Sequence, residues 1–304
     1  MNILIPLVIT DAMLVSSSVA EPAAGETAWV SAGTYVIGDL RIRTTTHRVY
    51  QCIQAHTGRT ALPENDPLYW DDSDPTQKWA PFDTETSTEV TGTSPMTYVL
   101  SPGFFDGARL YKLTGSSLNL TVKDGPGGAV LETRTISLYE EALGLYEYLF
   151  SPARPKGKII ADGLPIHPTA EITFTITGPS TVGVGMIAVG QARQIINPST
   201  WGGTEYGASV EPVTYSRIKT DDFGKTTIKR GNAATGMRAT VVLPIADANF
   251  ALQSIQQVLD QPVSIVMSQM PNYAGLNFFG LVNATLTYKT PVSVELAING
   301  KGMI

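Results

Sequence analysis

The chain has 304 residues, of which 43% are hydrophobic and 16% charged, and its formal net charge is −6. This length suffices for two or three domains with a sizeable core. The low charge suits a protein that covers part of its surface with partners. A nucleic-acid footprint needs clustered lysines and arginines, and the nearest candidates, Lys225, Lys229, Arg230 and Arg238, alternate with polar residues, so we expect no nucleic-acid partner. The single cysteine excludes an intramolecular disulfide.

Residues 1–25 begin with an apolar, strand-like run and end in a linker. The run at residues 3–9 is short, contains Pro6 and follows no basic segment, so it does not have the pattern of a signal peptide. The chain has no stretch of about 20 apolar residues, so we expect no membrane insertion. The segment 21–25 (EPAAG) has the composition of a linker. A strand followed by a linker pairs elsewhere, either in its own chain or in a neighbour.

Residues 26–83 form a small module that is rich in aromatic residues and turns. It holds three of the four tryptophans of the chain: Trp29, Trp70 and Trp79. Strand signals occupy residues 34–37, 40–44 and 48–55. A module of this size has little apolar surface to bury, so aromatic side chains must supply much of its core. Cys52 lies in the last of these strands, where we expect a buried thiol that packs as a small hydrophobic group.

Residues 84–190 alternate polar and apolar residues and predict a β-sandwich. The run 173–177 (TFTIT) shows the alternation, and 124–128 (DGPGG) predicts a turn between two strands. The expected strands are 97–100, 108–114, 118–123, 130–138, 172–177 and 182–189. The segment 139–150 is compatible with a short helix and with continued sheet.

Residues 191–304 predict a second β domain with one packed helix. The expected strands are 213–219, 226–230, 238–243, 263–267, 278–288 and 292–298. Residues 245–260 place apolar side chains at helical spacing and end before Pro262, which stops a helix. These apolar positions are Ile245, Phe250, Leu252, Ile255, Val258 and Leu259. The predicted fold is therefore mainly β: a small aromatic-rich β module, a β-sandwich, and a C-terminal β-sheet domain with one packed helix.

The module carries an ordered set of aromatic residues with a Gly-Asp pair: Trp29, Tyr35, Gly38-Asp39, Tyr50 and Trp70. This order resembles the small carbohydrate-binding modules of families 5 and 12 found on chitinases and cellulases. We expect the Gly-Asp pair to form a turn between two strands, because glycine tolerates a positive φ and aspartate bonds back to the backbone.

Sugar binding by such modules depends on aromatic rings that stack on a pyranose, and the same rings can equally be core. The expected core residues are Trp29, Tyr35, Gly38 and Asp39. The candidate carbohydrate-binding residues are Tyr69, Trp70, Tyr50 and Trp79. Tyr69 and Trp70 stand beside a loop rich in proline and aspartate, where binding residues often occur. Trp79, at the exit of the module, is alternatively a staple to the next domain.

Two segments that flank the module resemble tail proteins of tailed bacteriophages. The exit 74–83 (DPTQKWAPFD) and the opening 9–14 (ITDAML) are similar to segments that accompany such a module in those proteins. The resemblance covers about the first 85 residues; residues 201–207 (WGGTEYG) and 222–224 (DFG) are similar, more faintly, to baseplate and distal-tail-type subunits.

This resemblance implies a structural (minor tail) subunit of a tail tip or baseplate, located in the virion tail and assembled in the host cytoplasm. The implied partners are other tail and baseplate subunits, with a homo-oligomer around the tail axis. A bacterial surface glycan is a further implied partner, because repetition of a weak site around the tail multiplies its binding.

Catalytic and metal-binding patterns are poorly supported. A glycosidase needs two facing carboxylates, and the available ones fall in turn-like segments: Asp71, Asp72, Asp74, Asp221 and Asp222. The three histidines, His47, His56 and His167, lack the spacing of a metal site. The glycine-rich run 201–207 is not followed by Gly-Lys-Ser/Thr at the four-residue spacing of a phosphate loop, so it is not one. We therefore expect no enzyme, no metal and no cofactor; the alternatives are a stand-alone carbohydrate-binding protein and a polysaccharide-active enzyme.

Overall fold

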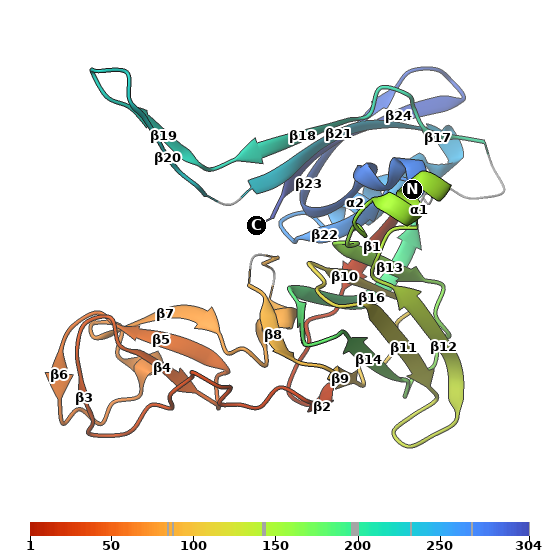
Figure 1. Ribbon diagram of the computed structural model, residues 1–304. Helices are drawn as coiled ribbons and strands as arrows, with labels where there is room; N and C mark the ends of the chain where they lie inside the picture. Colours follow the sequence, from red (N-terminus) through yellow and green to blue (C-terminus); the bar gives the residue numbers. More distant parts are fainter. Residues whose placement is uncertain are drawn as a thin grey trace.

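The computed structural model describes residues 1–83, 85–86, 88–141, 144–195, 201–231, 233–268 and 270–303. As predicted, the chain is mainly β with one packed helix, and the structure shows that the sheet against which this helix packs is curled. Figure 1 shows a small module at the lower left, a body of packed sheets, and a two-stranded arm that projects from the curled sheet at the upper left. Among the described residues, no helix is long and apolar enough to cross a membrane.

The module consists of two small antiparallel sheets. One sheet contains β4 (Leu40–Arg43), β5 (Arg48–Cys52) and β7 (Trp70–Pro75). The other contains β3 (Thr34–Tyr35) and β6 (His56–Thr57). Two 3-10 turns accompany them: η1 (Pro63–Asn65) before β7, and η2 (Ala80–Phe82) at the exit. Strands this short form few ladder hydrogen bonds, so the module depends on its aromatic core.

The body contains a five-stranded antiparallel sheet. Its order is β12 (Val130–Ser137), β11 (Ser117–Lys123), β14 (Glu171–Thr177), β9 (Met96–Leu100) and β2 (Leu14–Ser17). Alternate residues of β11, Leu118, Leu120 and Val122, are fully buried. They share a core with three strands of a larger sheet: β10 (Gly107–Tyr111), β13 (Lys158–Asp162) and β16 (Met186–Gln194). A separate pair, β8 (Val90–Thr93) and β15 (Thr181–Val184), adds valines to the same core.

The larger, ten-stranded sheet continues into the C-terminal part and curls around one helix. Its C-terminal strands are β22 (Val263–Val266), β23 (Asn277–Tyr288), β24 (Ser293–Gly302), β21 (Ala233–Pro244), β17 (Gly203–Thr204) and β18 (Ser209–Thr214). The helix α2 (Ala248–Gln256) follows the 3-10 turn η3 (Ile245–Asp247), and η4 (Pro271–Leu276) precedes β23. A second apolar core joins α2 to these strands.

The predicted helix is present and packs against the curled sheet. Ala248, Ala251 and Ile255 are buried at helical spacing, whereas Phe250 and Leu252 are exposed. Small alanine side chains permit a close approach of the helix to the sheet. The apolar pattern therefore predicted the helix but did not by itself separate its buried from its exposed side chains.

Strand β1 (Asn2–Pro6) lies in the interior of the ten-stranded sheet (Figure 1). It pairs antiparallel with β16 on one side and with β22 on the other, so the opening strand pairs within its own chain. Its approach to β16 requires a glycine: a Cβ at Gly190 would lie 1.9 Å from the carbonyl oxygen of Ile5. Through β1, one sheet runs from the strands of the sandwich to those of the C-terminal part.

A buried ionic network crosses this junction. Arg109 of β10 is fully buried, and its Nη2 lies 3.1 Å from Asp162 Oδ2 of β13. The same guanidinium donates to Ser264 Oγ of β22 at 2.8 Å, while Asn2 of β1 donates to Asp162 Oδ2 at 3.0 Å. Tyr111 donates to Ser264, and burial raises the pKa of Tyr111 to about 12. Residues from both parts of the sheet therefore satisfy one buried cation, which would be costly if left alone.

The short helix α1 (Leu145–Phe150) and the arm have no buried side chains. The helix α1 lies between β12 and β13, so the segment 139–150, left open by the sequence, contains a short helix. The arm contains β19 (Arg217–Thr220) and β20 (Thr226–Lys229), which pair only with each other, and every residue of both strands is exposed. Neither element contributes to the described cores.

We predict that Arg109→Met lowers the free energy of unfolding by about 3–5 kcal/mol, because it leaves the Asp162 carboxylate buried without its cation. Denaturant titration of the whole chain measures the loss. Lys289→Met is the control: it removes an exposed ion pair with Glu295 in the same sheet and should cost less than about 1 kcal/mol. Addition of Asp162→Asn to Arg109→Met should recover part of the loss. An Arg109→Met chain as stable as the control would contradict this reading.

Candidate functional site

Four residues form the core of the aromatic module: Tyr35, Tyr50, Cys52 and Trp70. The rings of Tyr35 and Trp70 meet edge to face, with centroids 4.9 Å apart. The Tyr35 hydroxyl donates to the Val30 carbonyl at 2.8 Å and accepts the Val30 N–H. Cys52 is fully buried, and burial raises the pKa of its thiol. Tyr35 therefore lies in the module core, where the sequence placed it, and Cys52 packs as a small apolar group.

Two of the candidate sugar contacts are buried. Trp70 is 2% exposed and Tyr50 is 4% exposed. A ring that stacks on a pyranose must offer a free face, and these rings have theirs inside the module. The expectation that Trp70 and Tyr50 contact a sugar does not fit this geometry. The reason is physical: so small a module needs its largest side chains for its own core.

Tyr69 and Trp29 lie at the edge of this core and are half-buried. The guanidinium of Arg59 lies 3.8 Å from the centre of the Tyr69 ring, and that of Arg43 lies 5.5 Å from the Trp29 ring. Each arginine therefore occupies one ring face by a cation–π contact. Of the four candidate sugar contacts, Tyr69 and Trp79 keep partial exposure.

The Gly-Asp pair forms the predicted turn between β3 and β4. Gly38 has a positive φ of 93°, which a glycine adopts without strain. Asp39 Oδ2 accepts the backbone N–H of Val36 at 3.1 Å and lies 3.5 Å from the Arg41 guanidinium. These side-chain contacts hold the turn, so Asp39 has a structural role in this part of the module.

The junction between module and body centres on His47. Its ring stacks on Trp79 with centroids 4.4 Å apart. Its Nδ1 lies 2.9 Å from Glu21 Oε1, and its Nε2 lies 2.7 Å from Asp11 Oδ1. Glu21 also accepts a hydrogen bond from Thr76 Oγ1 at 2.8 Å. Burial lowers the pKa of His47, but the hydrogen bonds to Glu21 and Asp11 outweigh this effect, so the pKa lies above its ordinary value of 6.5.

Trp79 connects this junction to the sandwich. The Trp79 ring meets Phe82 edge to face at 5.9 Å, and Phe82 meets Tyr98 of β9 at 5.6 Å. The candidate sugar contact Trp79 therefore packs as a staple, the alternative that the sequence left open. Four residues after Trp79, burial raises the pKa of Asp83 to about 6. Hydrogen bonds from the Thr88 hydroxyl and the backbone N–H of Glu85 to this carboxylate act in the opposite direction and lower the pKa.

No sequence pattern singles out His47, which lies in the turn between β4 and β5 with a positive φ of 56°. A histidine in a polar turn (TTTH) is ordinary, and its partners Asp11 and Glu21 are far away in the chain. Only the fold brings these charges together. The sequence indicated this junction only through Trp79 at the module exit. It did not indicate that His47 takes part in it.

The carboxylates considered for catalysis fall into two exposed groups, one on β7 of the module and one on the arm. Asp71, Asp72 and Asp74 are exposed along β7, with Asp72 in an ion pair with Arg48 at 2.7 Å. Asp221 and Asp222 lie at the tip of the arm. Within the described part of the chain, no three His, Cys, Asp or Glu side chains are placed to hold a metal ion.

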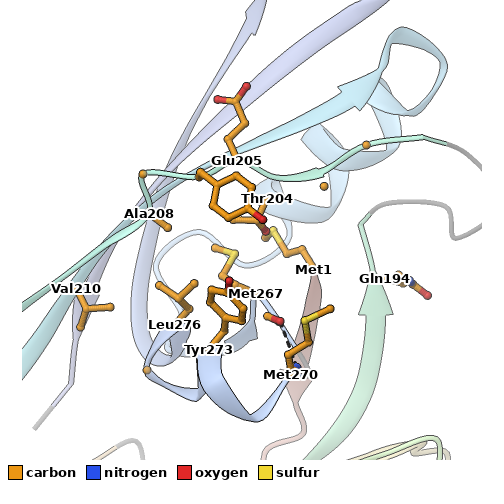
Figure 2. A pocket seen from close by; sticks show the side chains of 16 residues that line it. Met1, Gln194, Thr204, Glu205, Ala208, Val210, Met267, Met270, Tyr273 and Leu276 are labelled. Atoms are coloured by element: carbon orange, nitrogen blue, oxygen red, sulfur yellow. Dashed lines mark hydrogen bonds between the residues drawn. The ribbon is translucent and has the colours of Figure 1, made fainter.

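A pocket of about 660 Å³ lies between the loop after β17 and the segment after β22 (Figure 2). Met1, Met267, Met270 and Leu276 give it a flexible apolar lining. The carboxylate of Glu205 points away from these methionines in Figure 2. The lining also includes polar side chains, among them Gln194, Thr204 and Tyr273, so the pocket does not by itself define the class of its occupant.

Comparisons with protein-family models, with curated proteins and with solved structures found no match to this chain.

We predict that NMR titration of the His47 ring gives a pKa above 6.5. The protonated ring is held between two carboxylates, so its stabilising contribution is fully present below pH about 6.5, the unfolded value. The contribution is lost as the pH rises through the folded pKa. Urea denaturation of the wild type and His47→Gln should therefore differ most in acid and converge in alkali.

Glu21→Gln is the matched control for this titration, because it removes one negative charge at nearly constant size. It should lower the pKa of His47 and narrow the pH window of the effect. A difference in the free energy of unfolding between the wild type and His47→Gln that grows as the pH rises would contradict stabilisation of the protonated ring by the two carboxylates.

Proposed function

We propose that this chain is a structural subunit of a tailed-phage tail tip or baseplate. The observation that carries the proposal is the arm, whose β19 and β20 strands are exposed along their whole length. An isolated two-stranded hairpin is at best marginally stable in water. Ile218 and Ile228 stand directly opposite each other and are both exposed, and Phe223 near the tip is 98% exposed. Such apolar surface is typical of a segment that packs on a partner.

The second support is the organisation of the chain. A large body of packed sheets carries two projections, the module and the arm (Figure 1). The resemblance of residues 9–14 and 74–83 to tail proteins agrees with this arrangement. In this proposal the partners are other tail and baseplate subunits and further copies around the tail axis. The protein is then located in the virion tail after assembly in the host cytoplasm.

Adsorption to a bacterial surface glycan is a second proposed role, for the module alone. Tyr69 is the candidate contact that favours it, because this residue keeps part of its ring on the surface. Repetition of a weak site around a tail would raise the overall affinity. Retention on insoluble bacterial glycan that falls in Tyr69→Ala supports this role, whereas equal retention of both chains counts against it.

The alternatives are a stand-alone carbohydrate-binding protein and a polysaccharide-active enzyme. A stand-alone carbohydrate-binding protein would act without protein partners, so the exposed apolar residues of the arm would have no surface to pack on. The second needs paired carboxylates at a defined separation, and the carboxylates considered for this role lie on β7 of the module and on the arm. A subunit of an assembly explains the exposed apolar residues of the arm, which neither alternative explains.

The test is the position of the protein in assembled particles. Particles that carry a tagged copy of the whole chain are purified by density gradient, labelled with gold against the tag and imaged by electron microscopy. We expect several labels per particle, at one end of the tail. A tagged chain that stays in the soluble fraction while complete particles form would contradict the assembly role.

A further inference from the structure

The arm, residues 215–231, combines apolar and cationic side chains. It contains five lysines and arginines, at positions 217, 219, 225, 229 and 230, against two aspartates. Asp221 accepts the backbone N–H groups of Phe223 and Lys225 at 3.0 and 2.8 Å, so its carboxylate is used in the turn. Phe223 stands at the tip with its ring in solvent. The arm is therefore a basic surface with an apolar tip, on a chain whose net charge is −6.

The α1 segment, residues 140–154, has the opposite charge. It leaves the sheet after Tyr139 and returns at Pro155, where the two residues form a bridge. Its acidic residues are Glu140, Glu141 and Glu147, and Arg154 is its single cation. Glu140 and Glu141 are exposed.

The same segment is also strongly apolar. Tyr148 is 76% and Phe150 is 71% exposed, and Leu145, Tyr146 and Leu149 are exposed as well. A six-residue helix without tertiary packing is far below the length at which isolated helices are stable. The segment borders a hollow of about 750 Å³ whose lining includes Glu140, Glu141, Leu145 and Tyr148. This hollow joins acidic and apolar groups, which complement the basic arm and its apolar tip.

We propose, on the basis of the assembly role above, that the arm of one copy docks on the α1 segment of a neighbouring copy. Charge complementarity selects a second copy of this chain as the occupant. The two surfaces lie on different parts of one molecule, because the tip of the arm projects away from the body that carries α1 (Figure 1). The contact is therefore heterologous, and repetition of a heterologous contact gives a ring or a filament rather than a closed two-fold dimer.

The proposed contact pairs apolar side chains with apolar ones and basic side chains with acidic ones. Phe223 and the paired Ile218 and Ile228 leave water against Leu145 and Tyr148, which removes apolar surface from both copies. The arm cations then face the exposed glutamates of the α1 segment. Because the arm and α1 make no contribution to the described cores, substitutions in them are expected to leave the fold of each subunit intact.

Cysteine cross-linking tests the geometry of this contact. In a Cys52→Ser background, one chain carries Phe223→Cys and another carries Tyr148→Cys, and the two are mixed under mild oxidation. We expect disulfide-linked dimers in the mixture and none with either variant alone. Cross-links in Phe223→Cys alone would indicate an arm-to-arm contact, and a mixture without cross-links would show that the arm does not reach α1. Either result overturns the proposal.

Charge reversal tests the electrostatics. The arm variant carries Lys225→Glu, Lys229→Glu and Arg230→Glu, and the α1 variant carries Glu140→Lys and Glu141→Lys. Each should weaken self-association, measured by sedimentation velocity, by roughly tenfold or more. A mixture of the two variants should recover association, because the opposite charges are restored across the interface. Asp71→Lys with Asp74→Lys on the exposed strand β7 is the control and should leave self-association unchanged.

The outcomes separate this contact from the broader proposal. A chain that is found in particles but whose self-association is unchanged by both reversals remains an assembly subunit and loses this interface. A chain absent from particles that still forms mixed cross-links keeps the interface and loses the tail assignment. Equal melting temperatures of all variants confirm that a loss of association is not a loss of folding.

Discussion

The insertion of β1 between β16 and β22 is the contact on which the rest of this structure depends. Without β1, both of these strands would present unpaired edges, which proteins avoid because free edges pair with other chains. With β1 in place, the sandwich strands and the C-terminal strands form one ten-stranded sheet. Arg109 reinforces the junction, since its hydrogen bonds reach β13 and β22 at the same time.

The two projections, the module and the arm, differ in the contacts that attach them to the body. The module is attached through an ionic junction in which His47 is held by Asp11 and Glu21 and stacked on Trp79. The arm has no comparable contact: its strands pair only with each other. The module is thus oriented by its own chain, whereas in the proposed contact the arm is oriented by a neighbouring copy. A subunit built in this way suits an assembly in which the position of each copy is set by the next.

Local sequence patterns predicted the local structure well. The alternation in residues 173–177 lies in a buried strand, residues 245–260 contain the packed helix, and Gly38-Asp39 makes its turn. Each of these features follows from neighbours in the chain. The pairing of β1 does not, because the apolar run at residues 3–9 is compatible with any edge that needs a strand.

The candidate site was harder to predict for the same reason. Composition indicates an aromatic module, but the division between core and surface depends on which rings meet in three dimensions. Trp70 and Tyr50 turn inward, while Tyr69, next in sequence to Trp70, stays at the edge under Arg59. His47 gains its partners only when residues 11 and 21 come beside it. None of the side chains of helix α1 is buried, and the sequence alone left the structure of the segment 139–150 undecided.

Native-state hydrogen exchange of the whole chain tests the role of β1 most directly. If β1 joins the two parts of the sheet, the backbone amides of Ile3 and Leu4 should exchange only through global unfolding, at the rate of the protected amides of β22. The amides of β19 and β20 should exchange many times faster in the same sample. Exchange of Ile3 and Leu4 as fast as that of the arm would show that β1 is a loosely attached edge and would contradict the account.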